Sequence, residues 1–426
     1  MVTLTEKIKL IFTDKILRKK VLFVLVGLVL FRLLATIPVP GVDVLRLEAF
    51  FRTNEFLSLI NIFSGSGLSN LSVVMLGVGP YITASIIMQL LTMMSPKLKA
   101  MYQEEGDAGR IKFSQYSRRL SIPLAMVQAY GFLLLLSKQG LLGDLSGTSL
   151  FVNIIVITAG SALLMWIGEL ITEYGIGNGL SMIIFAGIVS QLPPVLGQFR
   201  DILAADPSKL PFYIAFALIA CVVIWAVVII TEAERSIPVT YAKQVHGGGS
   251  TNGGSTYLPL RVNQAGVIPI IFALSILLLP QMVFNFVKEL STNPTLIDIS
   301  QKALAFLNNN WVHAIAYFVL VFLFTYFYTA VTFDPQQIAT NLQKGGAFIP
   351  GVRPGDSTAL YLSKVVTRIT LVGAVFLSAI AVLPLILQNT TGNTSFAIGG
   401  TALLIVVSVV IDLVKKVEGQ VSMRSY

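Results

Sequence analysis

The chain has 426 residues, of which 55% are hydrophobic and only 12% are charged. Soluble globular domains carry about 25% charged residues, so this composition excludes a soluble fold with an ordinary charged surface. The formal net charge of +9 suits either nucleic acid or an anionic membrane surface. A helix that crosses about 30 Å of hydrocarbon needs roughly 20 residues, so a multi-span membrane protein accounts for this length.

Apolar runs bounded by charged residues or by Pro and Gly recur along the whole chain. Several contain proline, which a helix bundle tolerates because neighbouring helices satisfy the freed backbone groups. The first run lacks a cleavage site of small residues and is predicted to be a retained span. We predict ten membrane-spanning helices, at residues 21–37, 73–94, 117–136, 152–171, 180–198, 211–231, 265–287, 311–331, 367–388 and 396–414.

Lysines and arginines are divided unequally between the two sets of loops that alternate along these spans. With the amino terminus in the cytoplasm, 22 of the 30 lie on the cytoplasmic side and seven lie outside, while Arg32 falls within the first span. Cytoplasmic loops are enriched in Lys and Arg, so both termini are predicted to be cytoplasmic. The positive face then meets anionic lipid, and it also suits an acidic or RNA-bearing partner.

Few residues in the sequence are suited to chemistry. The two histidines, His246 and His313, have no evident partner, and the single cysteine, Cys221, lies in an apolar run and is predicted to be a buried structural thiol. Nucleotide-binding, metalloprotease and serine-hydrolase motifs are absent from the sequence. We therefore predict no metal, no cofactor and no enzymatic activity. Ionisable residues near the midplane, which a coupled solute transporter needs, are also sparse.

Three predicted loops are long enough to carry function. The outside segment 41–72 ends in small and polar residues that suit contact with protein or water better than contact with lipid. The cytoplasmic segment 232–264 contains a Gly/Ser-rich tip at 247–256. The cytoplasmic segment 333–366 surrounds Arg353 with Pro and Gly, and we expect this arrangement to present the arginine in a fixed turn.

Six short motifs follow one another along the chain. The longest is GVGPYITASIIMQLL at 77–91; the others occupy 37–41, 175–179, 255–263 with 265–269, 345–355, and 399–401 with 403–407. The motifs are distributed in order from residue 37 to residue 407, and they resemble the SecY/Sec61 family of protein-conducting channels, a resemblance that covers essentially the whole chain. Any one motif is weak evidence, whereas six in the same order are specific.

The resemblance implies an all-α polytopic membrane protein with ten transmembrane helices in two inverted, pseudo-symmetric halves of five. Residues 1–200 would form the first half, with a plug at about 60–72, and residues 201–426 the second half, with the two long cytoplasmic loops. Halves with an odd number of spans have opposite orientations, as in many transport folds. The family also implies a bacterial plasma (inner) membrane location.

A ring of aliphatic side chains is the implied narrowest point of the pore. Mid-sized aliphatic groups contact a passing polypeptide on all sides and exclude water by their apolarity. Residues four apart lie on one helix face, so each i, i+4 pair in the ring points the same way. Carried over by position, the ring consists of Val78, Ile82, Ile184, Ile188, Ile271 and Ile405.

A plug and a lateral gate complete the implied channel. Small plug residues make few apolar contacts, so moving the plug out of its closed position would cost little free energy. Polar contacts across the gate contribute about 0.6 kcal/mol each, and ordinary interhelical hydrogen bonds explain any one gate residue equally well. The implied plug is Phe63, Ser64, Gly65, Ser66, Gly67, Leu68, Ser69 and Asn70, and the implied gate residues are Thr83, Ser85, Gln89, Asn263 and Gln264.

The implied partners act mainly on the cytoplasmic side. With Lys243 and Arg261, Arg353 is predicted to contact the motor ATPase SecA or the ribosome, because a guanidinium suits carboxylate and phosphate alike. The family also implies SecE, which clamps the two halves, and SecG. A basic pair common in this family aligns with Gly248 and Gly249. Natural divergence and an engineered replacement both explain that difference.

We therefore predict the pore-forming subunit of a protein translocase. It would conduct unfolded preproteins across the membrane and release signal sequences and other hydrophobic segments sideways into lipid. Energy would come from SecA or from a translating ribosome. A secondary transporter of small solutes with discontinuous helices is the main alternative, and it predicts a binding constellation at the midplane. A second alternative is a membrane insertase or scaffold without a continuous pore.

Overall fold

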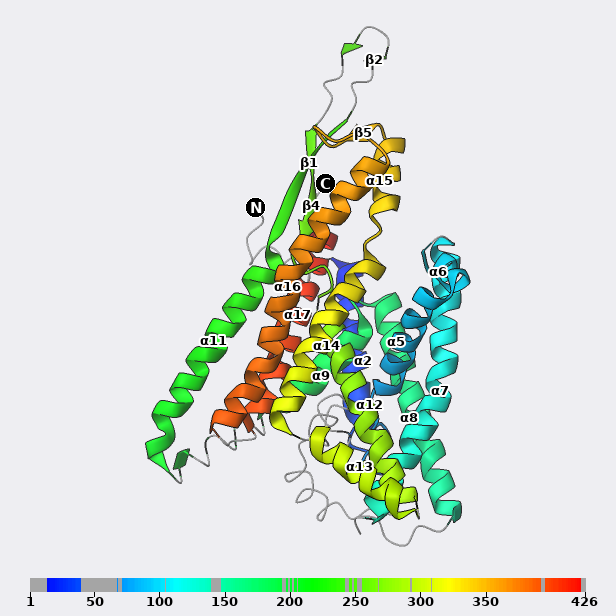
Figure 1. Ribbon diagram of the computed structural model, residues 1–426, viewed down its shortest axis with the longest axis vertical. Helices are drawn as coiled ribbons and strands as arrows, with labels where there is room; N and C mark the ends of the chain where they lie inside the picture. The colour runs from blue at the N-terminus through cyan, green and yellow to red at the C-terminus, as the bar shows by residue number, and fades with distance from the viewer. Residues whose placement is uncertain are drawn as a thin grey trace.

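The computed structural model describes residues 14–39, 67, 71–103, 105–138, 147–193, 197, 200, 203–204, 206–241, 245–246, 249–250, 255–266, 268–291, 293–307, 309–391 and 395–422. These residues form a bundle of long helices with a small β-sheet at one end (Figure 1). The short helices α6 and α15 lie at the sheet end of the bundle, and α13 lies at the opposite end.

The elements follow one another along the chain as a series of helices interrupted twice by strands, between α11 and α12 and between α15 and α16. The helices are α2 (Lys15–Leu34), α5 (Gly79–Met94), α6 (Pro96–Gln103), α7 (Gly106–Lys138), α8 (Gly147–Tyr174), α9 (Gly179–Val189), the 3₁₀ turn η1 (Pro207–Lys209), α11 (Leu210–Glu232), α12 (Ile268–Leu290), α13 (Pro294–Leu307), α14 (Asn310–Thr332), α15 (Pro335–Lys344), α16 (Asp356–Thr391) and α17 (Ser395–Ser422). The strands are β1 (Glu234–Tyr241), β2 (Val245–His246), β3 (Gly249–Ser250), β4 (Ser255–Arg261) and β5 (Ala347–Phe348).

Side-chain caps begin several of these helices. Asp14 accepts a hydrogen bond from the backbone amide of Ile16 at the start of α2. Asn178, Asn309 and Asp334 accept in the same way at the starts of α9, α14 and α15. A capping oxygen satisfies amide groups that have no partner within the helix. Such satisfaction matters most in a membrane bundle, where water is scarce.

Helices occupy all ten predicted apolar runs within the part of the chain that the structure describes. Five helical stretches there are long and apolar enough to cross a membrane: Gly147–Tyr174, Tyr213–Glu232, Ile268–Asn285, Asn310–Lys344 and Asp356–Leu387. Two shorter apolar helices, Gly79–Met94 and Gly179–Val189, lie within the second and fifth predicted spans. The prediction of a helical, multi-span fold is confirmed.

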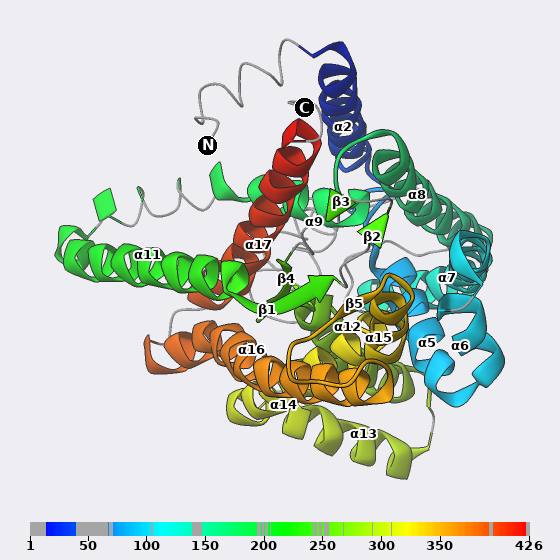
Figure 2. The same cartoon turned by 90° about the horizontal axis from the view of Figure 1, so that it is seen from above.

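Two groups of helices are visible when the bundle is seen from above. In Figure 2, α2, α7 and α8 lie on one side, and α11, α13, α14 and α16 lie on the other. Between the groups, α9 contacts α17, and α5 contacts α12. The first group belongs to the predicted amino-terminal half and the second to the carboxy-terminal half.

The antiparallel sheet at one end of the bundle was not predicted. Its strand order is β4-β1-β5, and β1 pairs with β4 from Glu234↔Arg261 to Thr240↔Ser255. Ile237, Val239 and Leu260 are buried against α16, whose Leu362 is fully covered. Alternation of apolar and polar residues at 236–240 is the sequence signal that indicates a strand here. The prediction of an all-α membrane fold therefore holds, and the structure adds this small sheet at one end of the bundle.

Cys221 lies on α11 and is exposed, so the prediction of a buried thiol is wrong. Only 6% of the apolar stretch Tyr213–Glu232 is buried, against 39–50% for the other four long stretches. An apolar run shows that a helix avoids water, but it does not show whether a given side chain faces protein or lipid. In α11 most side chains face outward.

Candidate functional site

All six predicted ring residues are buried in one hydrophobic cluster at the centre of the bundle. They come from four helices: Val78 precedes α5, which carries Ile82, and the others lie on α9, α12 and α17. Their exposed fractions run from 0% for Val78 to 7% for Ile82. The six residues therefore come from two helices of each predicted half, within a larger cluster to which other helices also contribute.

Helix contacts place the six residues on two pairs of packed helices. α5 packs against α12, which brings Ile82 and Ile271 into adjoining helices. α9 packs against α17 and places Ile184, Ile188 and Ile405 on a second helix pair. The i, i+4 spacing keeps Ile184 and Ile188 on one face of α9. In this structure the cluster is filled by side chains, as expected of a tightly packed apolar seal.

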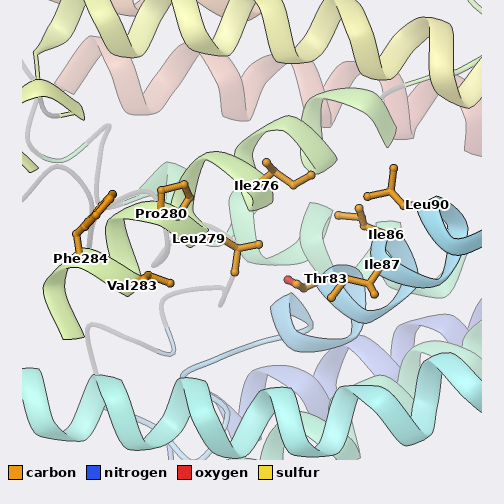
Figure 3. A pocket seen from close by; sticks show the side chains of 9 residues that line it. All are labelled: Thr83, Ile86, Ile87, Leu90, Ile276, Leu279, Pro280, Val283 and Phe284. Atoms are coloured by element: carbon orange, nitrogen blue, oxygen red, sulfur yellow. The ribbon is translucent and has the colours of Figure 1, made fainter. Parts of the chain in front are cut away.

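An apolar groove separates α5 from α12 beside this cluster (Figure 3). Its volume is about 490 Å³. Thr83 is the one lining residue with a hydroxyl, and that hydroxyl donates to the Gly79 carbonyl of its own helix at 3.1 Å. The groove wall is therefore apolar. The lining residues are Thr83, Ile86, Ile87, Leu90, Ile276, Leu279, Pro280, Val283 and Phe284.

Of the five predicted gate residues, Thr83 alone lines the groove. Ser85 lies three positions after Ile82, and Gln89 lies four positions after Ser85, so both share the face of α5 that carries Ile82. The Gln89 amide donates to the Ser85 hydroxyl at 3.4 Å. Asn263 is buried in the turn before α12, where its Oδ1 accepts from the Gly266 amide at 2.9 Å. Gln264 is half-buried in the same turn.

The predicted plug falls almost wholly outside the described residues, which include only Gly67 of that stretch. Gly67 is buried, and its carbonyl accepts from the Ser72 amide at 2.7 Å. Leu71 and Ser72, four and five positions later, are buried as well. Gly67 is thus bonded to the buried segment that leads to Val78.

Arg353 lies exposed in a turn between β5 and α16. Gly351 and Gly355 flank it with φ angles of 81° and 96°, which residues with a side chain rarely adopt. The Thr358 hydroxyl donates to the Arg353 carbonyl at 2.8 Å and holds the turn closed. Arg261 is exposed on β4 and pairs with Glu234 at 3.3 Å, while Lys243 lies outside the described residues.

An ion pair inside the bundle was missed by the sequence prediction. The Arg118 guanidinium of α7 donates to the Glu169 carboxylate of α8. Glu169 is 18% exposed and Arg118 44% exposed, so the pair lies partly within the protein. Opposite charges on neighbouring apolar helices were the available signal, but their 51-residue separation hid the pairing.

Comparison with known proteins agrees with this geometry. The family model described as SecY matches residues 72–414. The protein translocase subunit SecY of Mycobacterium leprae is 44% identical over 96% of this chain and 96% of its own. The chain belongs to the SecY family.

Solved structures of the SecY fold resemble this one. A SecY protein whose plug domain stabilises the closed state of its translocation channel matches with a TM-score of 0.67 at 21% identity, covering 95% of this chain and 92% of its own. Sec61 in a canine ribosome–channel complex matches with a TM-score of 0.62 at 20% identity and the same coverage. At these identities the likeness shows the fold, that of a multi-pass membrane protein, and residue roles rest on this chain's own geometry.

Proposed function

We propose that this SecY-family chain is the pore-forming subunit of a protein translocase. It conducts unfolded polypeptides across the membrane and releases hydrophobic segments sideways. The observation that carries the proposal is the convergence of six aliphatic side chains from both halves of the chain into one buried cluster. An apolar ring of this kind excludes ions and water when idle and has no charge that would trap a passing polypeptide.

The proposed pore lies between residues 1–200 and 201–426, which form its two inverted halves. The separation of the helix groups in Figure 2 supports this division. The groove lies between α5 of the first half and α12 of the second, and its apolar lining suits a hydrophobic peptide segment better than a polar one. We assign the lateral gate to this groove. Residues 63–70 form the plug.

The sheet end of the molecule is the proposed cytoplasmic docking surface, with both termini cytoplasmic in a bacterial plasma membrane. Arg353 is held in a fixed turn there. Arg261 on β4 adds positive charge, and Lys243 follows β1 in the sequence. We propose SecA and the translating ribosome as the partners of this surface. SecE and SecG are the proposed membrane partners.

A photoreactive amino acid in the ring tests polypeptide passage directly. The chain, purified with its partner subunits, is loaded with a secretory protein that is stalled during translocation. A probe at Ile82 is expected to cross-link to the stalled polypeptide, whereas a probe at Val222, which is 62% exposed on α11, is not. Equal cross-linking at the two positions would overturn the proposed path.

Ion conductance tests the seal. Ile82→Gly opens the ring, so the resting conductance of the channel in a planar bilayer is expected to rise several-fold. Ile86→Gly is the matched control for this resting conductance, because Ile86 is also buried, one turn further along α5, but lines the groove and is not a ring residue. Both changes carry the same helix penalty of about 1 kcal/mol. A tight Ile82→Gly channel contradicts the assigned ring.

Deletion of 62–70 is expected to raise the resting conductance as well.

A further inference from the structure

Residues 71–78 form a non-helical segment that leads into α5 and ends at the ring residue Val78. Consecutive turns shape it: the Met75 amide donates to the Ser72 carbonyl at 2.9 Å, and the Gly77 amide donates to the Val74 carbonyl at 2.8 Å. Val78 is fully buried. Irregular backbone inside a membrane bundle persists only where protein groups satisfy and enclose it.

The beginning of this segment is held by the chain that follows α2. The Val39 amide donates to the Leu71 carbonyl at 2.7 Å, and the Val73 amide donates to the Ile37 carbonyl at 2.9 Å. These two bonds form one antiparallel bridge, Pro38↔Ser72. They fix residues 71–73, but the part of the segment that reaches the ring needs a second support.

That support is one position on α8. Gly160 approaches the segment so closely that a Cβ atom added there would lie 2.1 Å from the Val73 carbonyl oxygen and 2.8 Å from the Val73 carbonyl carbon. Both atoms belong to the backbone, so neither can move aside as a flexible side chain would. Only glycine allows this approach.

Ser161, the next residue on α8, holds the other end of the segment. Its buried hydroxyl donates to the Gly77 carbonyl at 2.9 Å. Two adjacent residues of α8 therefore contact both Val73 and Gly77, and Val78 follows directly. We call Gly160 and Ser161 together the seat. Neither residue belongs to the ring, but both contact the segment that carries Val78.

We propose that Gly160 and Ser161 are positioning residues for the seal. They hold residues 73–77 on α8 and thereby set the position of Val78 in the ring. The inference rests on the proposed function, because it requires the ring to close the pore. It assigns to α8 a role in keeping the resting channel tight that goes beyond the packing of one helix on another.

Gly160→Ala is the principal test. The added methyl group forces the Val73 carbonyl outward by roughly 1 Å in a densely packed interior, and the shift is transmitted to Val78. The resting KCl conductance in planar bilayers is expected to rise several-fold. Gly147→Ala on the same helix is the control, because a Cβ at Gly147 meets nothing within 4 Å. Unchanged conductance of folded Gly160→Ala overturns the proposal.

A second pair of variants decides the matter if Gly160→Ala fails to accumulate in membranes. Ser161→Ala removes the hydroxyl that holds Gly77, whereas Thr158→Val removes a buried hydroxyl of α8 that has no partner among the described residues. Ser161→Ala is expected to leak measurably more than Thr158→Val. Equal conductance of the two variants, or a lowered Tm without any leak, overturns the positioning role.

The route through Val78 is tested by combining changes. Val78→Ala and Gly160→Ala act on the same point of the ring, so the double variant is expected to leak less than the product of the two separate fold-increases. A double variant whose leak equals the product of the two separate fold-increases contradicts the proposal that Gly160 acts through Val78. Ile82→Gly, measured in parallel, separates the two proposals. If it stays tight, the assigned ring is wrong; if it leaks while Gly160→Ala stays tight, only the seat is wrong.

Discussion

The apolar cluster around the ring and the apolar cluster beneath the sheet consist of the same kinds of residue but are stabilised differently. The sheet cluster joins one face of β1 and β4 to the first turns of α16, with Ile237, Val239 and Leu362 at its centre. On the proposed topology it lies in the cytoplasm. Water is then the competing environment, and burial contributes about 25 cal/mol for each Å² of apolar surface.

The ring cluster has lipid as its competing environment. Lipid tails are as apolar as Ile or Val, so burial in the bundle brings little hydrophobic gain. Close backbone packing and interhelical hydrogen bonds stabilise the bundle in place of this hydrophobic gain. A Cβ at Gly179 would lie 1.9 Å from the Gly168 carbonyl oxygen, and the Gly179 amide donates to the Thr172 hydroxyl at 2.8 Å. A closed pore in a membrane therefore depends on small residues and single hydroxyls as much as on the aliphatic ring.

The largest expected effect lies at the sheet end and leaves the ring untouched. Arg353→Glu places a negative charge in the fixed turn, and SecA-driven translocation is expected to fall more than tenfold. Resting conductance should not change. Lys364→Glu, an equal charge reversal at an exposed position of α16, is the control. Translocation at the unaltered rate by Arg353→Glu, measured with a purified preprotein, contradicts the assigned role.

A core truncation in the sheet cluster should have the next largest effect. Leu362→Ala removes a fully buried side chain, and such changes cost about 2–5 kcal/mol. Limited proteolysis at 234–261 should become much faster while resting conductance stays low. Leu360→Ala is the control because Leu360 is 72% exposed. A leak in Leu362→Ala would show that the two clusters are coupled and are not stabilised independently.

The smallest expected effect is the loss of a surface ion pair. Arg261 and Glu234 are 51% and 36% exposed, and exposed pairs contribute about 0.2–1 kcal/mol. Arg261→Ala should therefore shift proteolysis of the sheet only slightly. The proposed partner contact of Arg261 predicts that translocation falls while the sheet stays intact, and Arg261→Lys, which keeps the charge, shows whether the guanidinium itself is needed.

Several features followed from the sequence because they depend on local chemistry. Hydropathy located the helices, since each span must satisfy its backbone internally and face an apolar environment. The motif around Gly79 and Pro80 identified the family, and family position selected ring residues that are all buried in one cluster. The Pro and Gly around Arg353 predicted a turn, and positive φ angles at Gly351 and Gly355 are present.

Other features required the tertiary structure, because each depends on residues far apart in the chain. Periodicity on α5 does not show that Ile86 and Leu90 line the groove against α12 while Gln89 does not. Hydropathy does not show whether Cys221 meets protein or lipid. The need for glycine at position 160 arises from a carbonyl 87 positions earlier in the chain. Membrane insertion is determined by composition, but the fit of one backbone against another is determined only by the assembled bundle.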